Sequence, residues 1–133
     1  MEDKNTINYY IAAEKRIGQP VLQLCFEEMN FHGEFDGVWA CASLLHVKKE
    51  NLPNIITKLM AALKYGGVLY ASWKYGTSER RSGGRYFCDL TEERVSGLLT
   101  EQDEYVLQEC WITEDVRAEH KFEKWLNAII RKK

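Results

Sequence analysis

The chain has 133 residues, 45% hydrophobic and 29% charged, which is the composition of an ordinary globular protein with one hydrophobic core. Its 18 lysines and arginines are balanced by 20 aspartates and glutamates, giving a net charge of -2, and this balance argues against nucleic acid as a partner, which requires a basic surface. No apolar run is long enough to cross a membrane, and the polar start MEDKNTINYY is unlike a secretory signal. We therefore expect one cytoplasmic domain over residues 1–133, with no membrane partner.

The cysteines and histidines show no pattern of a metal site. Cys25, Cys41, Cys88 and Cys110 form no Cys-x-x-Cys pair, and neither they nor the histidines have the paired short spacing of structural zinc. We expect reduced, mostly buried thiols, no metal, and histidines that are internally satisfied or face solvent.

The first third of the chain predicts a helix and a strand, followed by a second strand. Asn5 or Thr6 can cap the helix, and Gly18 is suited to end it. The apolar run Pro20–Phe26 predicts a short strand, and Phe35–Ala42 predicts a buried one.

The middle of the chain contains the clearest helix, which follows Asn51. Its apolar residues recur at helical spacing, and Gly66 with Gly67 is expected to end it; these apolar residues are Leu52, Ile55, Ile56, Leu59, Met60 and Leu63. Val68–Tyr75 predicts the next buried strand.

The last part of the chain predicts a loop, a helix and two strands. Gly76–Arg85 has no apolar anchor and is expected to be a mobile loop, and Thr91 can cap a helix whose first turn is acidic. YVLQECWITEDV and KWLNAIIRK predict an antiparallel strand pair at the sheet edge. The four tryptophans are interpreted as core residues: Trp39, Trp73, Trp111 and Trp125.

Strands that alternate with helices predict an α/β fold, with a sheet covered by helices on both faces. Ligands of such sheets bind beyond the carboxyl ends of the strands. The relevant ends are Phe26–Glu27, Ala42–Leu44 and Lys74–Gly76.

Three ordered stretches carry a family resemblance. FDGVWACASLLHV, LPNIITKLMAALKYGGVLYASWKYG and GRYFCDLTEERV resemble class I S-adenosylmethionine-dependent methyltransferases, above all the small bacterial tellurite-resistance-like or type 11/12 group. The match covers residues 9–130. The resemblance implies a Rossmann-like sheet, S-adenosylmethionine as cofactor and methyl transfer to a small molecule.

The resemblance covers only the later part of that fold. The family begins with a strand, a Gly-x-Gly turn that lets the backbone approach the cofactor, and a second strand, whereas none of the nine glycines here has that spacing. We therefore expect a partial, truncated sheet that lacks the family's first two strands, and a chain that is inactive when isolated. The alternative is a non-catalytic remnant or interaction module.

The resemblance also suggests binding residues but no catalytic one. Cys25 and Phe26 match the end of the family's third strand, beside the adenine, and the turn Ala42, Ser43 and Leu44 matches the wall around the methionine end of the cofactor. A turn of small residues needed only for packing is the alternative. Ser43 and His46 do not form a hydrolase pair, because the Gly-x-Ser-x-Gly turn is missing.

Four further residues flank the family's mobile substrate loop, namely Lys74, Tyr75, Arg85 and Tyr86. They are candidates for contacts with a polar substrate, and a surface loop with an anchoring aromatic residue remains the alternative.

The missing strands also predict a partner. The family's strand order is three-two-one-four-five-seven-six, so a chain without strands one and two has a gap beside Phe35–Ala42. An exposed apolar edge is a site of pairing, and the connection from Phe26 to Glu34 is short for a parallel crossover. We expect a homodimer in which a second copy covers this edge by strand pairing or segment exchange.

Overall fold

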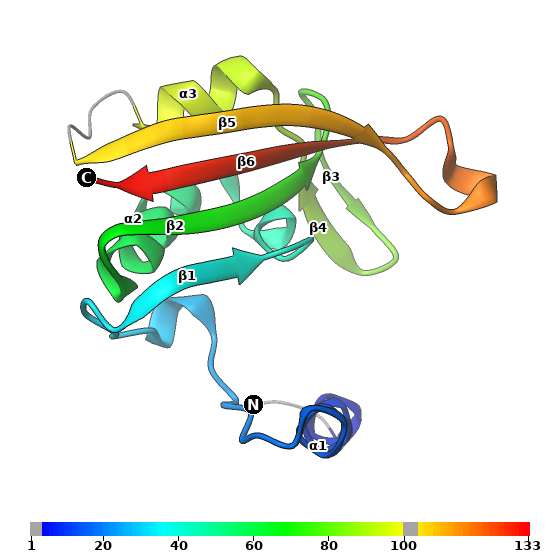
Figure 1. Cartoon of the computed structure of the whole chain (residues 1–133). Coiled ribbons are helices and arrows are strands. Elements are labelled where there is room, and N and C mark those ends of the chain that lie inside the picture. The colour runs from blue at the N-terminus through cyan, green and yellow to red at the C-terminus, as the bar shows by residue number, and fades with distance from the viewer. Residues whose placement is uncertain (1–3, 100–103) are drawn as a thin grey trace.

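A computed structural model describes residues 4–99 and 104–133 of the chain (Figure 1). In chain order its helices are α1 (Lys4–Ile17), α2 (Leu52–Ala62) and α3 (Glu92–Leu99), and its strands are β1 (Phe35–Ala40), β2 (Leu63–Lys74), β3 (Glu79–Ser82), β4 (Arg85–Cys88), β5 (Tyr105–Glu114) and β6 (Lys124–Lys132). None of the described helices is both long and apolar enough to span a membrane.

Four strands form the main sheet, in the order β1-β2-β6-β5. β1 runs parallel to β2, while β6 is antiparallel to both β2 and β5. This order corresponds to four-five-seven-six of the methyltransferase sheet, so the partial Rossmann-like α/β fold is confirmed. The antiparallel pair expected at the edge is confirmed as well, with β5 outermost.

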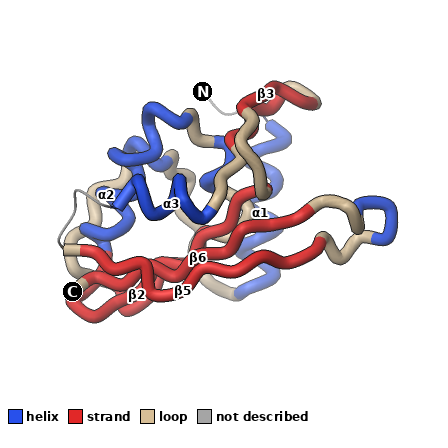
Figure 2. The backbone as a smooth tube through the Cα atoms, turned by 90° about the horizontal axis from the view of Figure 1, so that it is seen from above, coloured by secondary structure: helices blue, strands red, loops and turns tan. Residues whose placement is uncertain are grey.

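One face of the sheet forms the core. Alternate side chains of the two central strands are fully buried there: Leu69, Ala71 and Trp73 of β2, and Leu126, Ala128 and Ile130 of β6, all 0% exposed. Helices α2 and α3 lie against this face, as the view from above shows (Figure 2). The apolar side of α2, including Ile55, Leu59 and Met60, completes the core. Each such side chain contributes about 1.5–3 kcal/mol by its burial.

Among the described helices only α2 and α3 cover a face of the sheet, and α1 lies away from it, beyond the β1 edge (Figure 1). The opposite face therefore lacks the cover that was expected on both sides. Trp39 of β1 lies on it and is 74% exposed, so its assignment to the core was wrong. Its ring stacks on Tyr70 of β2 with centroids 4.2 Å apart. Trp73 is fully buried, and Trp111 and Trp125 are half-buried.

Helix α2 ends at Ala62, earlier than expected, because Leu63 already pairs with Phe35 of β1. Gly66 and Gly67 therefore lie within a strand. Gly66 has a φ of 84°, and a Cβ at Gly67 would come within 2.9 Å of the Lys64 carbonyl oxygen. The two glycines allow β2 to bend where it passes close to β1.

Two predictions for the first part of the chain fare differently. The first helix is confirmed, although it begins at Lys4 and not after Asn5 or Thr6; Gly18, with a φ of 68°, donates its N–H to Glu14 and ends it. The strand predicted over Pro20–Phe26 was wrong: residues 20–25 belong to no helix or strand, and a 3₁₀ turn follows at Phe26–Glu28. An apolar run becomes a strand only where a neighbouring strand offers hydrogen bonds.

The loop expected at Gly76–Arg85 is a β-hairpin, and its prediction as a mobile loop was wrong. β3 and β4 pair in antiparallel register, from Glu79 opposite Cys88 to Ser82 opposite Arg85. Gly83 and Gly84 connect them with φ values of 58° and 78°, the left-handed conformation that a two-residue type I′ turn requires. The Gly-Gly pair was the signal for this hairpin.

The thiols are also less buried than expected. Cys88 is buried and Cys110 half-buried, but Cys25 and Cys41 are exposed. In the part of the chain that the structure describes, none of the four cysteines forms a disulfide.

Candidate functional site

The turn after β1 is held in an unusual conformation. Ala42 has a φ of 50°, the only left-handed non-glycine residue among those described. Its N–H donates to the Ser72 hydroxyl at 2.8 Å, and Ser72 is itself buried in β2. Such a backbone conformation costs about 1–3 kcal/mol and persists only where the surrounding structure holds it, and strained residues of this kind cluster at functional sites. This turn lies at the carboxyl ends of the parallel strands β1 and β2, where α/β sheets bind ligands.

A cavity of about 550 Å³, which we call cavity A, opens beside this turn on the face of the sheet without helices. Tyr70, Ser72 and Asn127 line its floor. The Tyr70 hydroxyl donates to Asn127 Oδ1, and Asn127 Nδ2 donates to Thr113 Oγ1 at 3.0 Å. Burial raises the pKa of Tyr70, so its hydroxyl keeps its proton and serves as a donor.

The walls of cavity A bring together two of the predicted substrate-loop residues. Lys74 and Arg85 both line it, with Phe87 and Trp125. Lys74 Nζ lies 5.1 Å from the Phe87 ring centroid and 6.0 Å from that of Trp125. Arg85 forms no ion pair with any described residue. The cavity thus combines aromatic surface with cationic and neutral hydrogen-bond donors.

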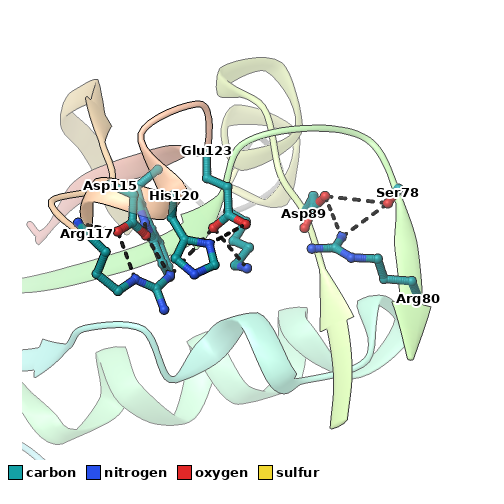
Figure 3. Close-up of polar contacts among 9 residues, drawn as sticks. Ser78, Arg80, Asp89, Asp115, Arg117, His120 and Glu123 are labelled. Atoms are coloured by element: carbon teal, nitrogen blue, oxygen red, sulfur yellow. Dashed lines mark hydrogen bonds and ion pairs between the residues drawn. The ribbon is translucent and has the colours of Figure 1, made fainter. Parts of the chain in front are cut away.

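A network of charges holds the β5–β6 connection at the rim of cavity A (Figure 3). Arg117 donates from Nε and Nη2 to the two oxygens of the buried Asp115 carboxylate, both at 2.9 Å, and Trp125 Nε1 donates to the same carboxylate at 3.0 Å. These hydrogen bonds hold the pKa of Asp115 well below its usual range. Glu123 joins the network through Lys74 at 3.5 Å and His120 at 3.2 Å. Sequence reasoning missed this network because its members come from a connection with no recognisable motif.

A second cavity of about 570 Å³, cavity B, lies on the other side of the turn. Cys25, Phe26 and Ser43, three of the predicted cofactor-binding residues, line it together with Glu27. Tyr10 of α1 also contributes to its wall. Residues that are 18 positions apart in the sequence, Cys25 and Ser43, thus meet at one cavity. Ala42 lines cavity A instead.

His46 lines both cavities. It ends the 3₁₀ turn Leu44–His46, its Nδ1 lies 2.8 Å from the Tyr86 carbonyl oxygen, and its ring packs edge-on against Phe87 with centroids 4.8 Å apart. It is half-buried, and its place between the cavities was not predicted. The one signal in the sequence was its position, three residues after Ser43 in the turn at the end of a parallel strand.

Three predicted site residues lie elsewhere. Leu44 is 0% exposed and packs in the core, so it lines neither cavity. The Tyr86 side chain donates to Glu79 across the hairpin, and burial together with this hydrogen bond raises the pKa of Tyr86 to about 12. Tyr75 lines a smaller cavity of about 290 Å³ next to Asp89. Successive side chains of a strand point to opposite sides of it, so Tyr86 points away from cavity A while its neighbours Arg85 and Phe87 line that cavity.

Within the described ranges, no three His, Cys, Asp or Glu side chains gather closely enough to hold a metal ion. Cavities A and B combine aromatic side chains with a few hydrogen-bonding groups, which is typical of sites for organic ligands.

Comparison with known proteins gives similarity in structure and none in sequence. No family model matches the chain, and no curated protein matches its sequence. The 1,6-didemethyltoxoflavin-N1-methyltransferase of Burkholderia thailandensis, solved with 1,6-didemethyltoxoflavin and S-adenosylhomocysteine, superposes with a TM-score of 0.74 at 17% identity, covering 92% of this chain and 56% of that protein. A SAM-dependent methyltransferase of Methanosarcina mazei gives a TM-score of 0.71 at 16% identity, covering 98% of this chain and 78% of that one.

The same fold also occurs with another reaction. The [4+2]-cyclase SpnF superposes with a TM-score of 0.66 at 13% identity, covering 98% of this chain and 63% of SpnF. This chain thus spans little more than half of the first of these proteins, and at such identities the likeness concerns the fold alone. The chain has the Rossmann-like fold of S-adenosylmethionine-dependent methyltransferases, over the part of that fold that it spans.

Proposed function

We propose that the protein is a methyltransferase-family protein that transfers a methyl group from S-adenosylmethionine to a small molecule. Cavity B takes the nucleoside part of the cofactor, and cavity A takes the methyl acceptor. The observation that carries this proposal is the meeting of both cavities at the strained turn after β1. In support, this turn lies at the carboxyl ends of parallel strands, in a fold whose solved members include one with bound S-adenosylhomocysteine.

The residues of cavity B suit a nucleoside in part. Phe26 and Tyr10 offer aromatic surface to a purine ring, and the exposed carboxylate of Glu27 can accept hydrogen bonds from ribose hydroxyls. No glycine lines cavity B, so the close backbone approach of a Gly-x-Gly turn has no counterpart there among the described residues. We therefore expect weak binding by this chain alone, and little unaided catalysis.

The bound cofactor would supply an activated methyl group, which leaves the protein to position the acceptor. Cavity A has fixed groups that suit this role. The Tyr70–Asn127–Thr113 hydrogen bonds hold its floor, and the Asp115–Arg117 pair holds its rim. A flat ring with polar substituents would meet the aromatic wall of Phe87 and Trp125.

Calorimetric titration with S-adenosylhomocysteine tests this proposal. We expect saturable one-to-one binding, weakened about tenfold in Glu27→Gln by the loss of a charged hydrogen-bond acceptor. Phe122→Ala is the matched control, because Phe122 is exposed and lines neither cavity. No heat and no thermal shift with the wild-type chain would overturn the assignment of cavity B.

A second candidate function is that of an interaction module that self-associates through β1, and one observation favours it. Among the described strands, β1 pairs with β2 only, and Trp39 stands exposed beside this free edge. We propose that a second copy of the chain covers the edge and Trp39.

Light scattering over a concentration series distinguishes this candidate. We expect a homodimer for the wild-type chain and a monomer for Trp39→Glu, which places a charge on the apolar surface. A wild-type chain that is monomeric at every concentration contradicts the candidate, whatever the outcome of the cofactor titration.

A further inference from the structure

The ring of His46 is held in one orientation at the boundary between cavities A and B. The edge contact with Phe87 restrains the ring plane, and the contact between Nδ1 and the Tyr86 carbonyl restrains its rotation within that plane. Both neighbours belong to β4, so the hairpin positions a side chain that follows β1.

This contact also decides which nitrogen carries the hydrogen. A carbonyl oxygen only accepts hydrogen bonds, so at 2.8 Å the Nδ1 of His46 must be the donor. The neutral imidazole then has its lone pair on Nε2. No described residue donates a hydrogen bond to Nε2. The side chain therefore presents an uncommitted proton acceptor at a place where both cavities meet.

Two other titratable groups of cavity A, Asp115 and Tyr70, are less suited to accept a proton. The Asp115 carboxylate is engaged by Arg117 and Trp125, which lowers its pKa and makes it a weak base. Tyr70 retains its proton because burial raises its pKa. Histidine is the side chain that most often accepts a proton from a reacting group in enzymes.

We propose that His46 accepts, through Nε2, the proton of the methyl acceptor, and that the acceptor is therefore an N–H or O–H compound such as an amine, an N–H heterocycle or a phenol. This inference rests on the proposed methyl transfer. The nitrogen or oxygen lone pair forms the bond to the methyl carbon, and the carbon–sulfur bond breaks with its electron pair remaining on sulfur. The sulfonium becomes a neutral thioether, the proton moves to Nε2, and the positive charge passes to the imidazolium and then to water.

The test uses phenol and anisole as probes of the full chain with ¹⁵N-labelled histidine. The two probes have similar rings, but only phenol can donate a hydrogen bond. His46→Gln is the matched variant: it keeps an N–H donor for the Tyr86 carbonyl and has no titratable base. His32 and His120 serve as internal references in the same spectra.

We expect the free chain to show His46 with hydrogen on Nδ1 and none on Nε2. Phenol should shift the Nε2 resonance of His46 and leave those of the reference histidines unchanged, whereas anisole should not shift it. His46→Gln should weaken phenol binding about tenfold, as expected for the loss of one hydrogen bond in a partly buried site, and leave anisole binding unchanged.

Three results would overturn the inference: hydrogen on Nε2 in the free chain, phenol binding of equal strength in the wild type and in His46→Gln, or no phenol binding at all. A parallel titration of His46→Gln with S-adenosylhomocysteine keeps the two proposals apart. Binding of that ligand with no role for His46 would leave the proposed function standing and remove only the proton acceptor.

Discussion

The two faces of the four-stranded sheet are built from the same strands but play different roles. On one face, alternate residues of β2 and β6 are sealed under α2 and α3, with Trp73 and Leu126 at 0% exposure. On the other face the intervening residues form an aromatic and polar surface, in which Trp39 stacks on Tyr70 and Asn127 bonds to Tyr70.

The difference shows how a strand can serve stability and ligand binding together. Successive side chains point to opposite sides, so Ser72 can support the turn at Ala42 while the neighbouring Trp73 fills the core. We expect changes on the covered face to cost stability and changes on the open face to affect mainly ligands or partners.

The largest expected effect contrasts two tryptophans of adjacent strands. Trp73→Ala leaves a large cavity in the core and should lower the free energy of unfolding by about 3–5 kcal/mol. Trp39→Ala removes an exposed side chain and its stacking on Tyr70, which should cost about 1 kcal/mol. Urea unfolding of both variants measures the contrast. These values are for the single chain, measured at concentrations where it is monomeric; where the proposed dimer forms, Trp39→Ala should cost more. An effect of Trp39→Ala as large as that of Trp73→Ala in the monomer would contradict the contrast.

An intermediate effect concerns the charges at the rim of the open face. Asp115→Asn removes the carboxylate that Arg117 and Trp125 bind, and should lower the urea midpoint at neutral pH. The pKa of Asp115 is lowered from 3.8 in the folded chain, so its stabilisation is fully present above that pH and is lost as the pH falls through the folded-state pKa. The difference in urea midpoint between the wild type and Asp115→Asn should therefore become smaller below about pH 4.

Asp36→Asn is the control for this prediction. Asp36 pairs with Lys64 at 3.7 Å on an exposed surface, where an ion pair adds little stability. The urea midpoint of Asp36→Asn should therefore stay close to that of the wild type. If the difference in urea midpoint between the wild type and Asp115→Asn stayed the same in acid, the size and shape of the side chain at position 115 would matter, and not its charge.

The smallest effects concern two glycines outside the main sheet and should have opposite signs. Gly84→Ala forces a side chain into a φ of 78° and should destabilise the hairpin beside cavity A by about 1 kcal/mol. Gly97→Ala, within α3 and with open space around its Cβ, should stabilise by about 0.5–1 kcal/mol. Thermal unfolding compares them, and a stabilising Gly84→Ala would mean that the turn does not need its left-handed conformation.

The sequence by itself determined the elements whose formation depends on neighbours along the chain. The 3.6-residue spacing from Leu52 to Met60 predicted α2, Gly18 marked the end of α1, and Thr91 marked the start of α3, where it accepts the Arg94 N–H at 3.4 Å. The resemblance also predicted the order of the four strands in the sheet.

Only the tertiary structure decided the features that depend on distant partners. Pro20–Phe26 has the composition of a strand but forms none, because strand formation requires a neighbouring strand that composition does not reveal. Trp39 has the hydrophobicity of a core residue, but burial depends on what packs over it. His46 gained its place between two cavities because β4, 40 residues later in the chain, supplies the carbonyl that orients its ring. Local periodicity encodes helices and strands, whereas pairing, burial and the meeting of side chains arise from contacts that form only when the whole sheet folds.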